Sequence, residues 1–92
     1  MKVSLVYFAQ IRQAAGTESE ILELPDGADL AAAVAEAAAR HGAAFRTLTL
    51  DKDGAVRPSL LVTINNGLAP RGKRIILRDG DEISLMSPIA GG

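Results

Sequence analysis

The sequence predicts an α+β domain in which a mixed β-sheet packs against one main helix. Two segments with strand-like alternation open the chain, an alanine-rich segment with helical spacing follows, and further strand-like segments come after it. With 92 residues the chain has room for one domain around one hydrophobic core. We therefore expect a single domain over residues 1–92, with a flexible tail from about residue 88.

Composition excludes several classes of protein. The absence of cysteine excludes disulfides, thiol catalysis and the usual zinc sites. Hydrophobic residues make up 48% and aromatic residues only 3% of the chain, which predicts a globular domain with an aliphatic core. The longest uncharged segment, residues 58–70, is too short to cross a membrane, and no signal peptide is visible. We expect a soluble cytoplasmic protein with no membrane partner.

Charge is unevenly distributed although the net charge is only −1. The first 39 residues carry two basic and six acidic side chains, whereas residues 40–92 carry eight basic and five acidic ones. The basic excess is concentrated in Arg71, Lys73, Arg74 and Arg78. This segment has no aromatic residue on which a base could stack, so we expect a solvated loop or a docking patch for an acidic partner, not a nucleic-acid site.

The first two predicted strands form a hairpin. Residues 2–8 alternate so that Val3, Leu5 and Tyr7 face one side, and residues 14–17 break the pattern with a glycine-containing turn. A second strand over residues 18–24 follows and is stopped by Pro-Asp-Gly.

A helix is predicted over residues 30–40, with Asp29 as its N-cap and Gly42 just past its end. Its apolar stripe comprises Leu30, Val34, Ala37 and Ala38. His41 is the only histidine and falls in the last turn, where a positive charge is favourable. We expect it to be a helix-end residue; the alternative is a catalytic base or metal ligand.

The second half of the chain is less regular. Over residues 43–58, Phe45, Leu48 and Leu50 are expected to be buried, and residues 51–54 to form an exposed turn. We expect a buried central strand at residues 60–64 and a tight Asn-Gly turn at residues 65–67. A loop at residues 68–77 ends in an apolar anchor (75–77), and a second turn at residues 78–81 leads to a last strand at residues 82–87. In the last strand Ile83 and Leu85 should point inward. A hairpin, a crossing helix and a mixed sheet together predict the β-grasp fold.

No nucleophile, phosphate-loop or metal-ligand motif is present in the sequence. The acidic segment at residues 79–82 could hold a cation, but it lacks the other ligands of a calcium loop and is better interpreted as a turn. Asp51 and Asp53 are likewise expected to be turn residues. We therefore do not expect this chain to be an enzyme on its own.

The end of the sequence is unusual. Residues 83–92 carry no charged side chain, and the last two residues are Gly91 and Gly92. One interpretation is a frayed terminus. The other is a tail that threads into another protein, because glycine permits close backbone approach. A carboxylate at Gly92 is ionised at neutral pH and is a poor electrophile, so it would need activation, most simply as an acyl-adenylate.

Residues 77–83 (LRDGDEI), running into residues 87–92 (SPIAGG), resemble the end of ubiquitin-like sulfur carriers of the MoaD and ThiS type. Within this family the small subunits of molybdopterin synthase are most similar. Residues 8–28 contain segments that resemble the family's opening, and residues 64–67 are similar to its Val-Asn-Gly turn. Residues 43–59 match poorly and look longer, and the position of Ser87 often carries proline in the family.

The resemblance implies a function. A ubiquitin-activating-like adenylyltransferase would use ATP to adenylate Gly92, and sulfur would then replace AMP to give a thiocarboxylate. The tail, comprising Pro88, Ile89, Ala90 and Gly91, would insert into the larger catalytic subunit of molybdopterin synthase, where sulfur passes to a pterin precursor of the molybdenum or tungsten cofactor. The resemblance implies no permanently bound cofactor and no metal.

The strand pattern places Phe8 and Met86 on the sheet face opposite the helix, where they would form an exposed apolar patch with Leu68. In the family, matching positions dock the larger subunit; the alternative is that these side chains fill gaps in the core. Two other functions stay open. Carriers of this shape also serve thiamin, cysteine or tRNA sulfur pathways or modify protein lysines, and a plain β-grasp interaction domain would have an inert tail.

Overall fold

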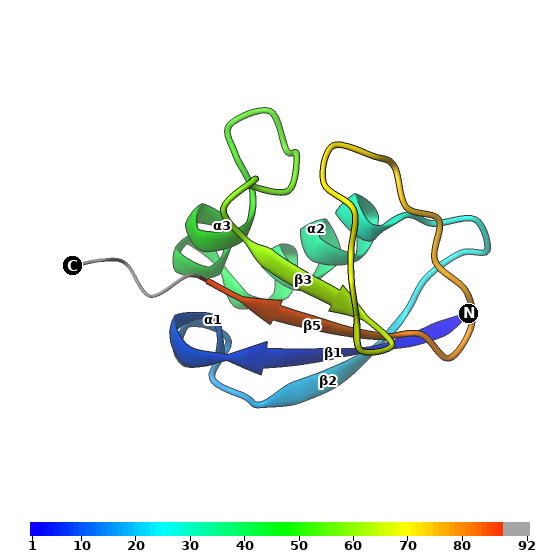
Figure 1. Ribbon diagram of the computed structural model, residues 1–92. Coiled ribbons are helices and arrows are strands. Elements are labelled where there is room, and N and C mark those ends of the chain that lie inside the picture. Colours follow the sequence, from blue (N-terminus) through cyan, green and yellow to red (C-terminus); the bar gives the residue numbers. More distant parts are fainter. Residues whose placement is uncertain (88–92) are drawn as a thin grey trace.

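The computed structural model describes residues 1–87 and shows a five-stranded mixed sheet (Figure 1). The strand order is β2-β1-β5-β3-β4, with β1 parallel to β5 and the other neighbours antiparallel. The strands are β1 (Lys2–Phe8), β2 (Ser19–Glu23), β3 (Leu61–Ile64), β4 (Gly67–Leu68) and β5 (Glu82–Met86). This arrangement, with a helix crossing over the sheet between β2 and β3, is the predicted β-grasp fold.

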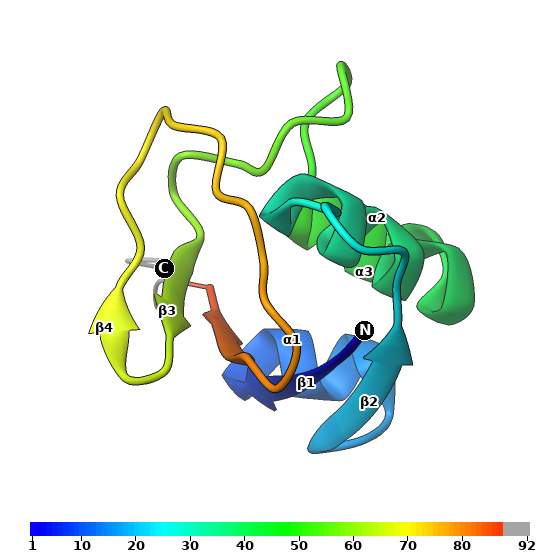
Figure 2. The same cartoon turned by 90° about the vertical axis from the view of Figure 1, so that its right-hand side faces the viewer.

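Three helices are present among the described residues, where the sequence predicted one: α1 (Ala9–Ala15), α2 (Leu30–His41) and α3 (Ala43–Thr49). Figure 2 shows α2 and α3 together on one face of the sheet. The short helices were missed because each presents very few buried side chains, Ile11 in α1 and Phe45 with Thr49 in α3. Two such positions are too few to establish a helical period. β1 and β2 pair antiparallel as the predicted hairpin requires, but α1 lies within their connection.

The main helix begins and ends as predicted. Asp29 caps α2, its Oδ1 accepting a hydrogen bond of 2.8 Å from the Ala32 backbone N–H. This hydrogen bond, outweighing partial burial and aided by Arg74, lowers the pKa of the Asp29 carboxyl. Gly42 follows the helix with a φ of 94°, a backbone conformation that glycine adopts at little cost. All four residues of the predicted apolar stripe are buried.

The core is mainly aliphatic, as composition predicted, but two aromatic side chains lie within it. Tyr7 and Phe45 are its two largest fully buried side chains, and their rings meet edge to face with centroids 5.3 Å apart. His41 packs beside both rings, at 5.9 Å from Tyr7 and 5.3 Å from Phe45. Tyr7 and Phe45 thus contribute large apolar rings to a core whose other buried hydrophobic side chains are aliphatic.

A polar cluster closes the core beside these rings. The Glu20 carboxylate of β2 accepts hydrogen bonds from the Tyr7 hydroxyl and from Nε2 of His41, and lies 3.4 Å from the Arg40 guanidinium. Burial favours the neutral form of Glu20, but these hydrogen bonds and the charges of His41 and Arg40 outweigh it and lower its pKa. Burial, together with Glu20, raises the pKa of the Tyr7 hydroxyl, which keeps this group a neutral donor.

Two predictions about the second half of the sheet differ from the structure. Residues 60–64 were expected to form a buried central strand, but β3 lies next to the edge strand β4 and only Val62 within it is buried. The apolar run was misleading because the helices of residues 1–87 cover only one face of the sheet, and the central strand is β5. The predicted anchor at residues 75–77 also holds only in part, since Leu77 is buried while Ile76 is 51% exposed.

The remaining elements are as predicted. Asn65 and Asn66 have φ values of 52° and 70°, as in the hairpin turn that the Asn-Asn-Gly sequence favours. Phe45 and Leu50 are buried and Leu48 is partly buried, and residues 51–54 form a turn. Ile83 and Leu85 point into the core.

We predict that Glu20→Gln lowers the free energy of unfolding by about 1–3 kcal/mol at neutral pH, because the buried Tyr7 and His41 groups lose a charged acceptor. The folded-state pKa of Glu20 lies below its ordinary value of 4.5, so its contribution is present above that pH and is lost as pH falls through the folded-state value. Urea unfolding measured from neutral pH downward should therefore show a difference between wild type and variant that decreases as the pH falls below 4.5. Glu23→Gln, which alters an exposed ion pair with Lys2, is the control and should cost less than about 0.5 kcal/mol. An undiminished difference in acid would contradict the assignment.

Candidate functional site

The predicted site has two parts, the tail and the apolar patch beside it. The tail residues Pro88, Ile89, Ala90, Gly91 and Gly92 lie outside the described residues. The described chain leads to the start of this tail at Ser87, which is buried and whose hydroxyl donates a 3.3 Å hydrogen bond to Oε1 of Gln10 in α1. The chain therefore leaves the sheet directly after its central strand, beside α1.

The apolar patch is centred on Phe8 and Met86. These residues are directly paired in the parallel register of β1 and β5, and Met86 pairs in turn with Leu61 of β3. Their neighbours in sequence, Tyr7 and Leu85, point into the core, so Phe8 and Met86 lie on the outer face, 40% and 39% exposed. The expected placement on the outer face is confirmed, and the alternative that they fill gaps in the core is wrong.

Leu68 lies on the same face but farther out. It pairs with Thr63 at the edge of the sheet and is 71% exposed. It is thus separated from Met86 by β3 and does not pair with it. Leu61, which sequence analysis missed, lies between them, and the alternation around the inward Val62 was the signal that could have found it.

Hydrogen bonds at the opposite end of β5 fix the register on which this patch depends. The Asn65 side chain donates to Oδ1 of Asp81 and accepts from the Glu82 backbone N–H, each over 2.9 Å. Oδ1 of Asp79 accepts a 2.8 Å hydrogen bond from the Lys2 backbone N–H. The turn before β5 is thereby tied both to the start of β1 and to the β3–β4 turn.

The acidic turn at residues 79–82 is a structural element. Oδ2 of Asp81 accepts a 2.8 Å hydrogen bond from the Arg78 backbone N–H, and Gly80 has a φ of 85°. Within residues 1–87, no group of three or more His, Cys, Asp or Glu side chains is arranged to hold a metal ion. The interpretation of this segment as a turn is therefore confirmed.

His41 lies in the last turn of α2, as expected. It contacts the Glu20 carboxylate and the core aromatic rings on the helix-covered side of the sheet, whereas Phe8 and Met86 lie on the other side. His41 thus belongs to the polar cluster and is not part of the patch.

None of the helices within residues 1–87 has the length and apolar character that crossing a membrane requires.

Comparison with known proteins places this geometry in a family. The model of the ThiS family matches residues 5–92, nearly the whole chain. The chain belongs to the ThiS family. The resemblance to ubiquitin-like sulfur carriers that the tail and turn motifs suggested is thereby confirmed. A protein of Chlamydomonas reinhardtii named molybdopterin synthase sulfur carrier subunit is 29% identical over 92 residues, which cover all of both chains.

Solved structures confirm the ubiquitin-like β-grasp fold for this ThiS-family chain. Small archaeal modifier protein 1 from Haloferax volcanii is 23% identical, with a TM-score of 0.85 over 100% of both chains. A chain from the complex of subunits 1 and 2 of the molybdopterin-converting factor of Helicobacter pylori is also 23% identical, with a TM-score of 0.59 over 100% of both chains. At these identities the likeness concerns the fold alone.

We predict that Asn65→Ala lowers the free energy of unfolding by about 1–2 kcal/mol more than Asn66→Ala does. Both residues have positive φ, so both variants carry the same kind of backbone strain, but only Asn65→Ala also removes the side-chain bonds to Asp81 and Glu82. Chemical denaturation measures the difference, and amide exchange at Glu82 should accelerate only in the Asn65 variant. Equal losses in the two variants would show that these bonds do not fix the register of β5.

Proposed function

We propose that this chain is a sulfur carrier in which the Gly92 carboxylate becomes a thiocarboxylate, and that it acts as the small subunit of a molybdopterin synthase. The observation that carries the proposal is the exposed Phe8–Met86 pair at the point where an uncharged tail leaves the central strand. The match of the ThiS family through residue 92 and the name of the Chlamydomonas relative support it.

The chemistry follows from the state of the carboxylate. A Gly92 oxygen attacks the α-phosphorus of ATP, pyrophosphate leaves, and an acyl-adenylate forms. A hydrosulfide-level donor then attacks the acyl carbon, the bond to AMP breaks, and a proton is released as the thiocarboxylate forms. Its sulfur is a competent nucleophile at neutral pH, whereas carboxylate oxygen is a poor one. In this proposal partner proteins supply the catalytic side chains, and the chain holds no cofactor permanently.

Two partners are proposed. A ubiquitin-activating-like adenylyltransferase must present ATP to Gly92, and a larger catalytic subunit must accept the charged tail. The structure of a molybdopterin-converting factor complex from Helicobacter pylori supports the second partner. Exposed aromatic and methionine side chains are enriched at protein interfaces, which fits docking through Phe8 and Met86. Because the activation consumes ATP, we propose that it takes place in the cytoplasm.

A ubiquitin-like protein modifier is the second candidate function. The similarity to small archaeal modifier protein 1, with its TM-score of 0.85, supports this second candidate. Activation at Gly92 would be the same, but a lysine amine and not a sulfur donor would receive the acyl group. Isopeptide conjugates of the chain on lysines in a lysate of its own host would identify this function.

We predict that deleting Gly92 abolishes adenylation while leaving the fold intact, because the buried hydrophobic core of the described residues lies between Val3 and Leu85. ATP–pyrophosphate exchange with an adenylyltransferase of the ubiquitin-activating type measures activation, and circular dichroism measures folding. Lys52→Ala, in an exposed turn, is the control and should exchange like wild type. Exchange by the deleted chain at the control's rate would contradict the assignment of Gly92.

We predict that Phe8→Asp or Met86→Asp weakens binding to the larger subunit by about 30-fold or more, because each buries a charge at the centre of the apolar contact. The unfolding free energy should change by less than about 1 kcal/mol, since both side chains are partly exposed. Ile21→Asp is the matched control: Ile21 is 63% exposed and pairs with Ser4 on the same face, but on the edge strand β2. A loss of binding no greater than that of the Ile21 variant would overturn the docking assignment.

A further inference from the structure

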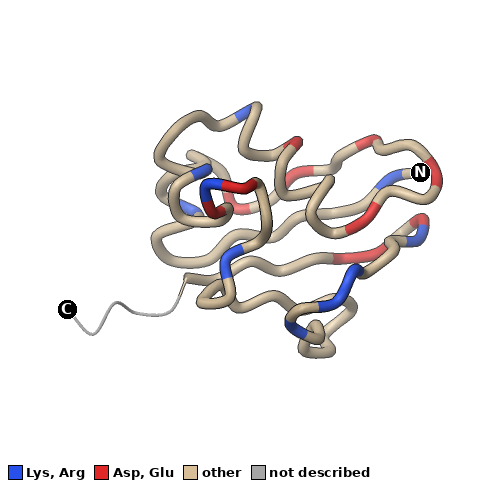
Figure 3. The backbone as a smooth tube through the Cα atoms, turned by 90° about the horizontal axis from the view of Figure 1, so that it is seen from above, with Lys and Arg blue, Asp and Glu red and all other residues tan. Residues whose placement is uncertain are grey.

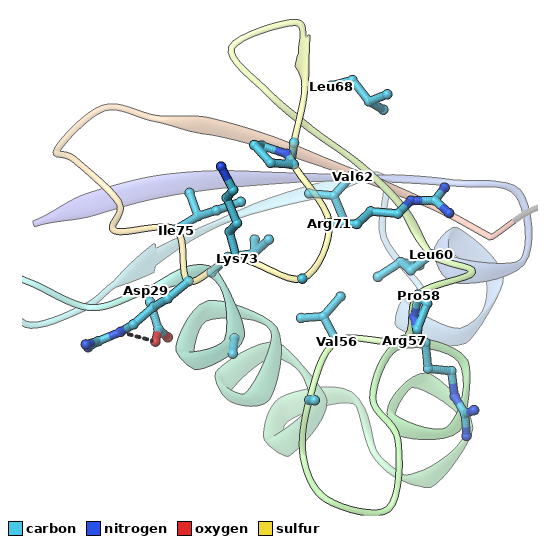
Figure 4. Close-up of a pocket in the computed structure, with 17 residues that line it drawn as sticks. Asp29, Val56, Arg57, Pro58, Leu60, Val62, Leu68, Arg71, Lys73 and Ile75 are labelled. Atoms are coloured by element: carbon cyan, nitrogen blue, oxygen red, sulfur yellow. Dashed lines mark hydrogen bonds and ion pairs between the residues drawn. The ribbon is translucent and has the colours of Figure 1, made fainter.

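A cavity of about 450 Å³ lies on the helix-covered side of the sheet, at its β3–β4 edge (Figure 4). Its floor is formed by residues of the core, among them Leu30 at the start of α2, Leu60 just before β3 and Val62 within β3. Two loops, residues 55–58 and 69–75, face each other across its opening. Its volume is within the range of about 300–1,000 Å³ that small-molecule sites occupy.

The sequence explains why this space is not filled. Around the cavity, short side chains occupy positions on α2 and on both loops, namely Ala31, Ala55, Pro58, Ala69, Pro70 and Gly72. An alanine-rich helix forms readily but projects little volume toward a sheet. The loops carry no aromatic residue that could cover the gap. The hydrophobic core is therefore open at this edge.

The rim of the cavity is basic. Four cations line it, and two of them are held by the protein: Arg57 donates to the Thr47 carbonyl over 2.7 Å and Arg74 to Asp29 over 2.9 Å. The other two, Arg71 and Lys73, form no ion pair with any acidic side chain of the described residues. Figure 3 shows basic positions following one another along one loop, whereas acidic positions predominate around the N-terminus.

We propose that this cavity binds a small amphipathic anion, with an apolar body seated on Leu60 and Val62 and an anionic group paired with Arg71, while Lys73, whose side chain points away from Arg71 in Figure 4, adds positive charge to the rim. An apolar floor removes the body from water, and a cation without an ion-pair partner complements a negative group. Charge complementarity also fits the excess of basic residues in this part of the chain. The cavity and the Phe8–Met86 pair lie on opposite faces of the sheet, so this proposal does not rest on the proposed function.

Sodium octanoate is the probe, with 1-octanol as the neutral probe of equal chain length. Titration of the ¹⁵N-labelled full chain at neutral pH should give saturable amide shifts confined to residues 55–58 and 69–75 and to the start of α2. Octanol should bind at the same place about tenfold more weakly, since it lacks the charged contact. No saturation, shifts confined to the outer face around Phe8 and Met86, or equal affinity for the two probes would each overturn the proposal.

Two variants separate the charge from the cavity. Arg71→Gln/Lys73→Gln should reduce octanoate affinity about tenfold and leave octanol affinity unchanged, whereas Arg46→Gln/Lys52→Gln, with the same charge change outside the cavity, should alter neither. Ala31→Phe should fill the cavity and abolish binding of both probes. Octanoate affinity equal in the Arg71/Lys73 and Arg46/Lys52 variants would overturn the proposal. Because the charge variants change only surface residues, that test stands even if Ala31→Phe fails to fold.

Discussion

The pairing of β5 between β1 and β3 is the constraint on which the rest of the structure depends. β5 is the last strand in sequence but the central strand in space, so it can be placed only when both neighbours are in register. The bonds from Asn65 and Asp79 near its start set that register, and at the other end of the strand the register determines that Met86 lies beside Phe8. A turn motif far from the tail thus determines which surface the tail emerges beside.

Coverage of the sheet on one side only is the second constraint. Helices α2 and α3 bury the inward side chains, and the polar cluster around Glu20 closes the core between β1, β2 and the end of α2. No helix within residues 1–87 covers the outer face, so its apolar residues remain exposed. At the β3–β4 edge the short side chains of the same alanine-rich helix leave the core open, which produces the cavity with its basic rim.

Much of this fold could be predicted from local chemistry. Alternation in β1 and β5 gave the correct faces for Tyr7, Phe8, Leu85 and Met86, and the Asp29 cap and Gly42 gave the limits of α2. The short helices escaped because their burial depends on tertiary contacts, as with Phe45 packing on Tyr7. The apolar run at residues 60–64 could not show that one face of β3 is uncovered. The cluster joining Glu20 to His41 unites residues 21 positions apart, a relation that no local pattern contains.

The central claim is that Gly92 carries sulfur, and it is tested most directly by mass spectrometry of the chain purified without a C-terminal tag from its own host. Fragmentation of the C-terminal peptide must place any mass change, because oxidation of Met86 nearly matches the exchange of oxygen for sulfur. The account predicts a fraction in which one oxygen of Gly92 is replaced by sulfur and is restored on hydrolysis. A plain carboxylate that persists after incubation with ATP, an adenylyltransferase and a sulfur donor would contradict it.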